Sequence, residues 1–122
     1  MVKFGYTINY VSDVEQALSF FEKVFLMKRK FLTDEKDYGE LETGETVLAF
    51  ASHELGKANF NGEYVSPTEL NKLLGVEIAL ESDDVHGIHD SALQNGAKEL
   101  KHQKLSHGGK RSRMYRRLRV YC

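Results

Sequence analysis

The sequence predicts an α+β domain built from two copies of one unit, in which a strand is followed by a helix and three further strands. A strand–helix–strand–hairpin pattern runs through residues 3–52, and a matching strand and helix recur within residues 75–95. The copies align at a constant offset of 71 residues, as expected of a duplicated supersecondary unit. The chain of 122 residues, 41% of them hydrophobic, is long enough for one domain.

The first copy opens with a strand and a helix. Residues 3–11 are rich in aromatic and β-branched side chains, which favour a strand. Ser12 and Glu15 have the spacing of a capping box, in which each side chain accepts a hydrogen bond from the other's backbone amide. The helix that follows carries apolar residues at three- and four-residue spacing on one face: Val14, Ala17, Leu18, Phe21, Val24 and Phe25.

Three strands complete the first copy. Residues 28–33 predict one strand. Tyr38–Glu42 and Thr46–Ser52 predict a hairpin that turns around Thr43-Gly44-Glu45. We therefore place the first module at residues 1–54.

The second copy follows a connection at residues 55–73, where periodicity is weak and which holds the single proline, Pro67. The second module spans residues 74–122, with a strand at 75–81 and a helix at 84–95. The offset pairs Tyr6 with Glu77, Asp13 with Asp84, and Val14 with Val85. The alternative is that any two strand–helix units resemble each other to this degree.

Composition limits the cellular setting and the class of partner. The single cysteine, Cys122, excludes an intrachain disulfide, and neither a signal peptide nor a membrane-spanning segment is predicted. A cytoplasmic protein is expected. Residues 1–100 hold nine Lys/Arg and eighteen Asp/Glu, whereas residues 101–122 hold eight Lys/Arg and no acid. The chain is thus an acidic body, with a net charge of −9, followed by a basic tail of +8.

Several segments resemble the vicinal oxygen chelate superfamily, which groups glyoxalases, bleomycin-resistance proteins and dioxygenases. The first module contributes the runs 5–14, 17–25, Tyr38–Gly44 and Leu48–Glu54, and the second contributes Gly75–Leu80, Asp84-Val85 and Gly96–Leu100. The resemblance implies paired βαβββ modules that form a curled, cup-shaped mixed sheet with helices on its outer face. It also implies a ligand held in the cup and, usually, a homodimer.

Metal-dependent members of this superfamily place one ligand on the first and fourth strands of each module. The resemblance puts these positions at Tyr6, Ala49, Glu77 and a fourth site beyond residue 110. Alanine cannot ligate a metal and tyrosine rarely does. The usual metal site is therefore predicted to be absent, and no cofactor is expected.

The histidines do not replace that site in our interpretation. His86 and His89 lie three residues apart on the second predicted helix and could share a face with Asp90, but a solvated helix surface is the simpler interpretation. His53 follows a strand and has no second partner at metal-site spacing.

The candidate ligand-binding residues come from strand alternation combined with the resemblance. Tyr6, Ile8 and Tyr10 share one face of the first strand, and Glu77 shares a face with Ala79 and Glu81. Phenols beside a carboxylate can stack on a planar ligand and attract a cation. If buried, Glu77 would also be a candidate general base. Alternatively, Tyr6 and Glu77 hydrogen-bond each other and only support packing.

Ala49 joins the candidate set because the resemblance places it in the cup. The predicted ligand-binding residues are thus Tyr6, Ile8, Tyr10, Ala49 and Glu77.

The basic tail, residues 102–122, departs from the pattern of the second module. It is either a basic arm for a polyanion or a segment read in the wrong frame. In the shifted frame, each codon consists of the last base of one residue's codon and the first two bases of the next residue's codon. Starting at Ser106–His107, this frame can encode Pro-Trp-Gly-Gln-Thr-Val-Ala-Tyr-Val, and the Arg119–Val120 junction can encode Gly. That string resembles the penultimate strand and turn of the same superfamily. We favour the frameshift. The final strands of the fold would then be atypical or lost, and binding to nucleic acid is not expected.

The leading functional hypothesis is a small-molecule-binding protein that uses no metal, like superfamily members that sequester antibiotics. The acidic body suits a cationic ligand. The alternatives are a metal-dependent lyase, isomerase or dioxygenase, and a polyanion-binding protein that uses the tail. Whether the chain is an enzyme stays open at this point.

Overall fold

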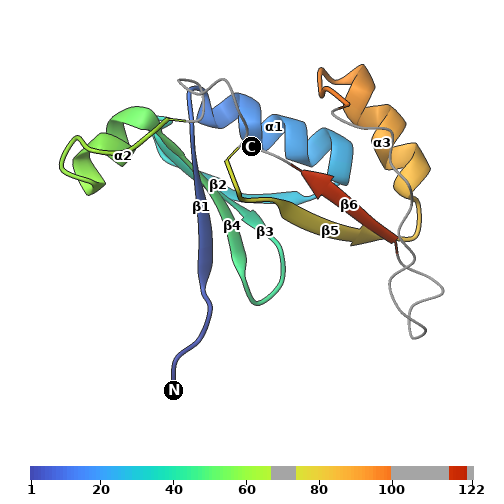
Figure 1. The fold of residues 1–122 in the computed structure, drawn as a ribbon, viewed down its shortest axis with the longest axis horizontal. Coiled ribbons are helices and arrows are strands. Elements are labelled where there is room, and N and C mark those ends of the chain that lie inside the picture. The colour runs from blue at the N-terminus through green and yellow to red at the C-terminus, as the bar shows by residue number, and fades with distance from the viewer. Residues whose placement is uncertain (67–73, 100–115, 121–122) are drawn as a thin grey trace. The chain divides into compact units, whose positions relative to one another are not determined.

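A computed structural model describes residues 1–66, 74–99 and 116–120 (Figure 1). The chain divides into two compact units, Met1–Asn71 and Lys72–Cys122, which we describe separately. No helix of the described part is long and apolar enough to cross a membrane.

The first unit contains the predicted βαβββ order followed by one further helix. Its elements are β1 (Tyr6–Val11), α1 (Val14–Phe25), β2 (Lys28–Leu32), β3 (Tyr38–Glu42), β4 (Val47–Ser52) and α2 (His53–Asn59). The strands form one open sheet in the order β1-β4-β3-β2. Strand β1 runs parallel to β4, whereas the other two pairs are antiparallel. The predicted α+β class and mixed sheet are therefore confirmed.

Helix α1 begins one residue later than the capping box predicted. Asp13, and not Ser12, is the N-cap residue, and its Oδ1 accepts a hydrogen bond from the Gln16 amide at 2.9 Å. The short carboxylate satisfies a backbone donor that would otherwise lack a partner in the first turn. The capping-box prediction for Ser12 and Glu15 is therefore wrong.

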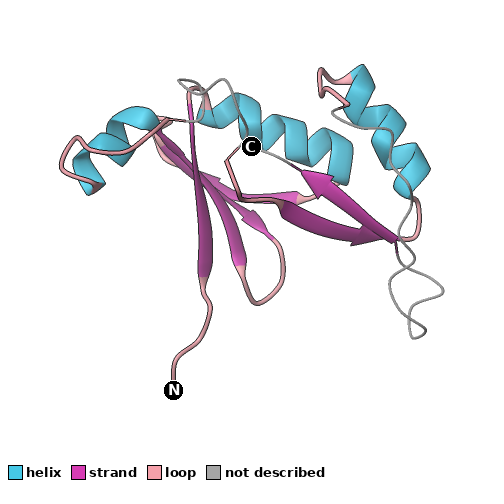
Figure 2. Ribbon diagram, in the orientation of Figure 1, coloured by secondary structure: helices cyan, strands magenta, loops and turns pink. Residues whose placement is uncertain are grey.

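The core of the first unit lies between α1 and one face of the sheet (Figure 2). The apolar stripe of α1 buries Leu18 and Phe21, and the Phe21 ring packs 5.1 Å from that of Phe50 on β4. Gly39 permits this close approach, because a Cβ there would lie 2.5 Å from Leu18 Cδ1. These contacts determine which face of the sheet is turned away from α1.

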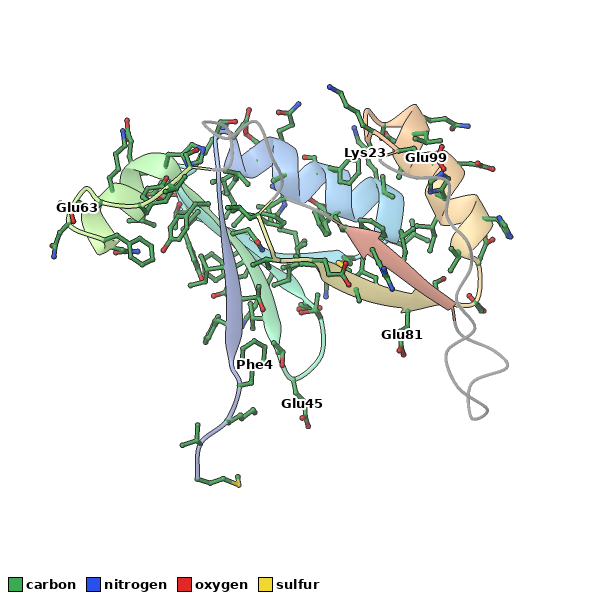
Figure 3. All side chains as sticks on the ribbon, viewed as in Figure 1. Phe4, Lys23, Glu45, Glu63, Glu81 and Glu99 are labelled. Carbon is green, nitrogen blue, oxygen red and sulfur yellow. The ribbon has the colours of Figure 1, made fainter. Side chains whose placement is uncertain are left out.

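The β3–β4 turn follows the predicted position. Gly44 has φ +88°, a conformation that glycine adopts without steric cost. Figure 3 shows Glu45 at the tip of this turn and Phe4 beside it, just before β1. The Val47 amide donates to the Gly5 carbonyl at 2.8 Å, which ties the turn to the start of β1.

Helix α2 is a feature that the sequence analysis missed, since residues 55–73 were expected to be an irregular connection. Ser52 caps it by accepting a hydrogen bond from the Leu55 amide at 3.2 Å. Gly56 lets the helix lie against β1, because a Cβ there would lie 2.8 Å from Tyr10 Cδ1. With seven residues, α2 is too short to show a clear apolar period.

The second unit contains β5 (Ile78–Ser82), α3 (Val85–Gln94) and β6 (Arg116–Val120). Asp84 caps α3 through a hydrogen bond from the Gly87 amide at 3.0 Å, and so repeats the role of Asp13 at the predicted offset of 71 residues. The strand predicted at 75–81 begins only at Ile78.

Strand β6 shows that part of the basic tail forms regular structure. It pairs antiparallel with β5, whereas β1 of the first unit pairs parallel with β4. Leu118 of β6 is buried and Arg119 is exposed. The rest of the sequence proposed to be frameshifted, residues 102–115 and 121–122, lies outside the described residues.

Candidate ligand-binding face

The first unit's sheet has a second face, opposite α1, on which the predicted ligand-binding residues lie. Leu41 and Phe50 pack toward α1, so their neighbours along each strand point the other way. The register pairs Ile8 with Ala49 and Ala49 with Glu40, and paired residues share a face. We call this side the tyrosine face, defined by Tyr6, Ile8, Tyr10, Tyr38, Glu40 and Ala49.

Glu40 is the charged group at the centre of the tyrosine face. The residue is only 5% exposed, and its Oε1 accepts a hydrogen bond from the Tyr38 hydroxyl at 2.9 Å. Its Oε2 lies 3.4 Å from Nζ of Lys30 on β2. A buried carboxylate needs such partners, because removing an ion from water is costly.

Tyr38 stays protonated because of this environment. Its pKa is raised from 10.0 to about 12. Burial is the largest cause, followed by the hydrogen bond to Glu40, the charge of Glu40, and the nearby phenols of Tyr6 and Tyr10. The three phenols therefore lie within electrostatic reach of one another. At neutral pH Tyr38 is a hydrogen-bond donor whose proton points to Glu40.

Tyr10 forms the border of the tyrosine face with α2 and the segment after it. Its ring lies 5.6 Å from the Phe60 ring and 5.5 Å from the Tyr64 ring. Its hydroxyl accepts a hydrogen bond from Asn59 Nδ2 at 3.2 Å. Packing thus restrains Tyr10, whereas Tyr6 and Ile8 are exposed and accessible to a ligand.

His53 belongs to the same border. Its Nδ1 lies 2.6 Å from the Tyr64 hydroxyl, and its Nε2 lies 3.4 Å from Ser66 Oγ. Both ring nitrogens therefore have protein partners. The arrangement supports the packing of α2 beside Tyr10 and leaves neither nitrogen directed to the tyrosine face.

The tyrosine face does not provide a donor set for a metal. Glu40 is its buried carboxylate, and the Lys30 ammonium lies against it. Within residues 1–66, 74–99 and 116–120, no three His, Cys, Asp or Glu side chains gather as a metal site would require. The fourth ligand position, beyond residue 110, was not located, so the predicted loss of the usual metal site stays a prediction.

The helix histidines do not form a pair. His86 and Asp90 are exposed, while His89 Nε2 faces Glu99 Oε1 at 3.5 Å. The placement of His86 and Asp90 agrees with a solvated helix surface.

Glu77 lies in the second unit, directly before β5. Its side chain is 42% exposed, and its Oε1 lies 3.7 Å from Arg119 Nε. The burial on which a general-base role depended is therefore missing. Figure 3 shows Glu81 projecting from β5 on the side away from α3. Because the two units are described separately, the expected meeting of Glu77 with Tyr6 and Tyr10 stays a prediction.

Tyr38, Glu40 and Lys30 are the site residues that the sequence analysis missed. A signal for Glu40 was present, because a hairpin around Gly44 pairs Glu40 with Ala49, which had already been assigned to the cup. No comparable signal existed for Lys30, which is positioned by an irregularity in β2.

Comparisons with known proteins bear on the fold. Neither a protein-family model nor a curated protein matches the chain. The structure is similar to a glyoxalase/bleomycin resistance protein/dioxygenase family enzyme from Burkholderia phytofirmans PsJN, with a TM-score of 0.55 and 14% identity, over 78% of this chain and 74% of that one. It is also similar to an integron cassette protein from the mobile metagenome of V. cholerae, with a TM-score of 0.49 and 14% identity, over 99% and 84%.

The first similarity establishes the class of protein at the level of the fold. The chain has the fold of the glyoxalase/bleomycin resistance protein/dioxygenase superfamily, as the sequence resemblance predicted.

Proposed function

We propose that the chain binds a small cationic, planar ligand on the tyrosine face, without a metal and without chemical turnover. The observation that carries this proposal is the Glu40 carboxylate, which is 5% exposed and accepts a hydrogen bond from the Tyr38 phenol. Tyr6 and Tyr10 lie on the same face of the sheet. A carboxylate with aromatic rings around it attracts a cation through charge and through the negative ring faces. Tyr6 and Ile8, which are exposed, supply area for stacking.

The partners of Glu40 favour binding over catalysis. The Tyr38 hydroxyl donates to Glu40 Oε1, and the Lys30 ammonium lies beside Oε2. Both oxygens therefore already have a protein partner, and a ligand cation can take the place of the ammonium, whereas a substrate proton finds no oxygen without a partner. Tyr38, with a pKa of about 12, is likewise a poor proton donor at neutral pH.

The competing functions have less support. A metal-dependent reaction lacks a donor set on the tyrosine face. For polyanion binding, the one arginine of β6 whose side chain is described, Arg119, lies with its Nε 3.7 Å from Glu77 Oε1. Neither alternative is as well supported as ligand binding.

The proposal extends to a cytoplasmic homodimer that sequesters a cationic antibiotic, by analogy with the sequence resemblance. Protection of DNA from bleomycin, with the drug recovered unchanged by mass, would support sequestration. Loss of intact bleomycin would support an enzyme instead. Light scattering during chromatography would measure the dimer.

The direct test of the site uses benzamidinium, a planar cation, and its neutral analogue benzamide, in calorimetric titrations. We expect the cation to bind more tightly, and Glu40→Gln to weaken its binding by roughly 10- to 100-fold, as for a lost charged hydrogen bond. Benzamide should respond little to the same change.

Glu42→Gln is the matched control, because Glu42 is the acid two residues further along β3 and its side chain is 51% exposed. It should alter binding less than about twofold, as expected for an exposed pair. Equal binding of benzamidinium and benzamide, or equal losses in both variants, would refute the proposal.

A further inference from the structure

Strand β2 contains a β-bulge at Lys30, beside Glu40. The register pairs Arg29 with Leu41 and then Phe31 with Glu40, so Lys30 is the extra residue of the bulge. Arg29 points to α1, where its guanidinium donates to Glu22 Oε1 at 2.8 Å and 2.5 Å. Bulges re-aim side chains and occur preferentially at sheet edges and beside functional sites.

The bulge gives Glu40 two neighbours from β2 where a regular strand would give one. Phe31 takes the position opposite Glu40 in the register, and its ring lies 5.9 Å from that of Tyr38. The Lys30 ammonium nevertheless reaches Glu40 Oε2 at 3.4 Å. A regular strand with Lys30 opposite Glu40 would have turned Phe31 to the other face.

The two members of the ion pair differ in burial. The Glu40 side chain is 7% exposed, whereas that of Lys30 is 49% exposed. Strand β2 is also an edge strand of the sheet, so a lysine there can extend into water. An ammonium on a flexible stem remains well hydrated, and it therefore loses little when it leaves the carboxylate.

We propose that Lys30 is a tethered counter-ion that competes with the ligand for Glu40 and thereby sets the selectivity of the tyrosine face. In the free protein the lysine neutralises the buried carboxylate. A ligand cation displaces the ammonium, which moves into water. The apparent affinity equals the intrinsic affinity multiplied by the fraction of molecules in which Lys30 has left Glu40.

This competition determines which cations are accepted. A simple monovalent ion gains little over the ammonium that it replaces. A ligand that joins a cation to a planar ring also gains contact with Tyr6 and Ile8. Lys30 has no ring and provides no equivalent contact, so such a ligand is favoured over a simple ion. The inference rests on the proposed cation binding and names the residue that restricts it.

The test compares benzamidinium titrations of three full-length variants. Lys30→Met should bind about three- to tenfold more tightly than the wild type, because the competitor is gone. Lys30→Arg should bind benzamidinium more weakly than the wild type, because a guanidinium can donate two hydrogen bonds to the Glu40 carboxylate and is harder to displace. Lys28→Met is the control: Lys28 is on the same strand, 79% exposed and 3.7 Å from Glu42, and its removal should change affinity less than twofold.

A second measurement uses the wild-type protein and so does not depend on how a variant folds. Limited reductive methylation, read by peptide mass, should label Lys30 several-fold faster when benzamidinium is bound, because the amine is released. Labelling of Lys28 should stay constant. Unchanged labelling of Lys30 at saturating benzamidinium would overturn the displacement.

The outcomes separate this inference from the proposed function. If Glu40→Gln abolishes binding but Lys30→Met binds no more tightly than the wild type, the competition is refuted and ligand binding stands. If neither the wild type nor Lys30→Met binds benzamidinium, both proposals fail.

Discussion

At the scale of single residues, the pair Tyr38 and Glu40 decides the chemistry of the tyrosine face. The Tyr38 hydroxyl donates to Glu40 at 2.9 Å, and the Glu40 side chain is buried. A buried anion without a partner would destabilise the fold. The phenol and Lys30 therefore support the fold and prepare the carboxylate for a cation.

Tyr38 provides a pH-dependent prediction. Its pKa is raised to about 12, so the folded chain keeps a proton that the unfolded chain loses near pH 10. Its contribution to the free energy of unfolding should be complete below pH 10 and fall as pH rises toward 12. Urea unfolding at several alkaline pH values should show this loss in the wild type and a smaller one in Tyr38→Phe.

Absorbance titration of the tyrosines checks the cause of the shift. Glu40→Gln should lower the pKa of Tyr38, because the charge and the accepted hydrogen bond change. The pKa should remain above 10.0, since burial is the largest cause. A pKa of Tyr38 that is unchanged in Glu40→Gln would contradict the contact.

At the scale of elements, two short features place the site. The bulge in β2 places both Lys30 and Phe31 beside Glu40, and α2 packs beside Tyr10. Both act on side chains already aligned by the regular strands β1, β3 and β4. The strands provide the face, while the irregular segments determine which of its groups are held and which are exposed.

The cap of α1 provides a stability prediction. Asp13→Ala should lower the free energy of unfolding by about 1 kcal/mol, because the Gln16 amide loses its acceptor. Ser12→Ala, one residue earlier, should change it by only a few tenths of a kcal/mol, roughly the effect of an ordinary surface substitution. Denaturant unfolding of both variants measures the difference, and an equal loss in the two would show that the cap is wrongly assigned.

At the scale of the whole molecule, both units contain a strand, a capping aspartate and a helix in the same order, but they differ in how their strands pair. Asp13 and Asp84 cap corresponding helices. Yet β1 has a parallel partner and β5 has an antiparallel one. The partner of β5 belongs to the basic tail, which the sequence analysis singled out as anomalous.

We expect the gene to contain a frame error in the codons of the tail. A one-base correction between codons 100 and 122 should restore an open frame with an apolar final strand, because Arg119 of β6 is exposed directly beside the buried Leu118. Sequencing of the gene and the intact protein mass are the measurements.

A gene and mass that both confirm the present tail would refute the frameshift. Binding to heparin at increasing salt would then be the next test. A steep salt dependence that is lost on deleting residues 102–122 would indicate a polyanion partner.

The sequence by itself determined the order of the elements in the first unit, the repeat at the offset of 71 residues, and the common face of Tyr6, Ile8 and Tyr10. These properties depend on local periodicity and on strand alternation, which neighbouring residues encode. Tertiary structure decided what the sequence analysis missed: the burial of Glu40, its pairing with Lys30 across a bulge, and the packing of α2 against Tyr10. Each depends on which strand lies beside which and in what register, and those contacts join residues far apart in the chain.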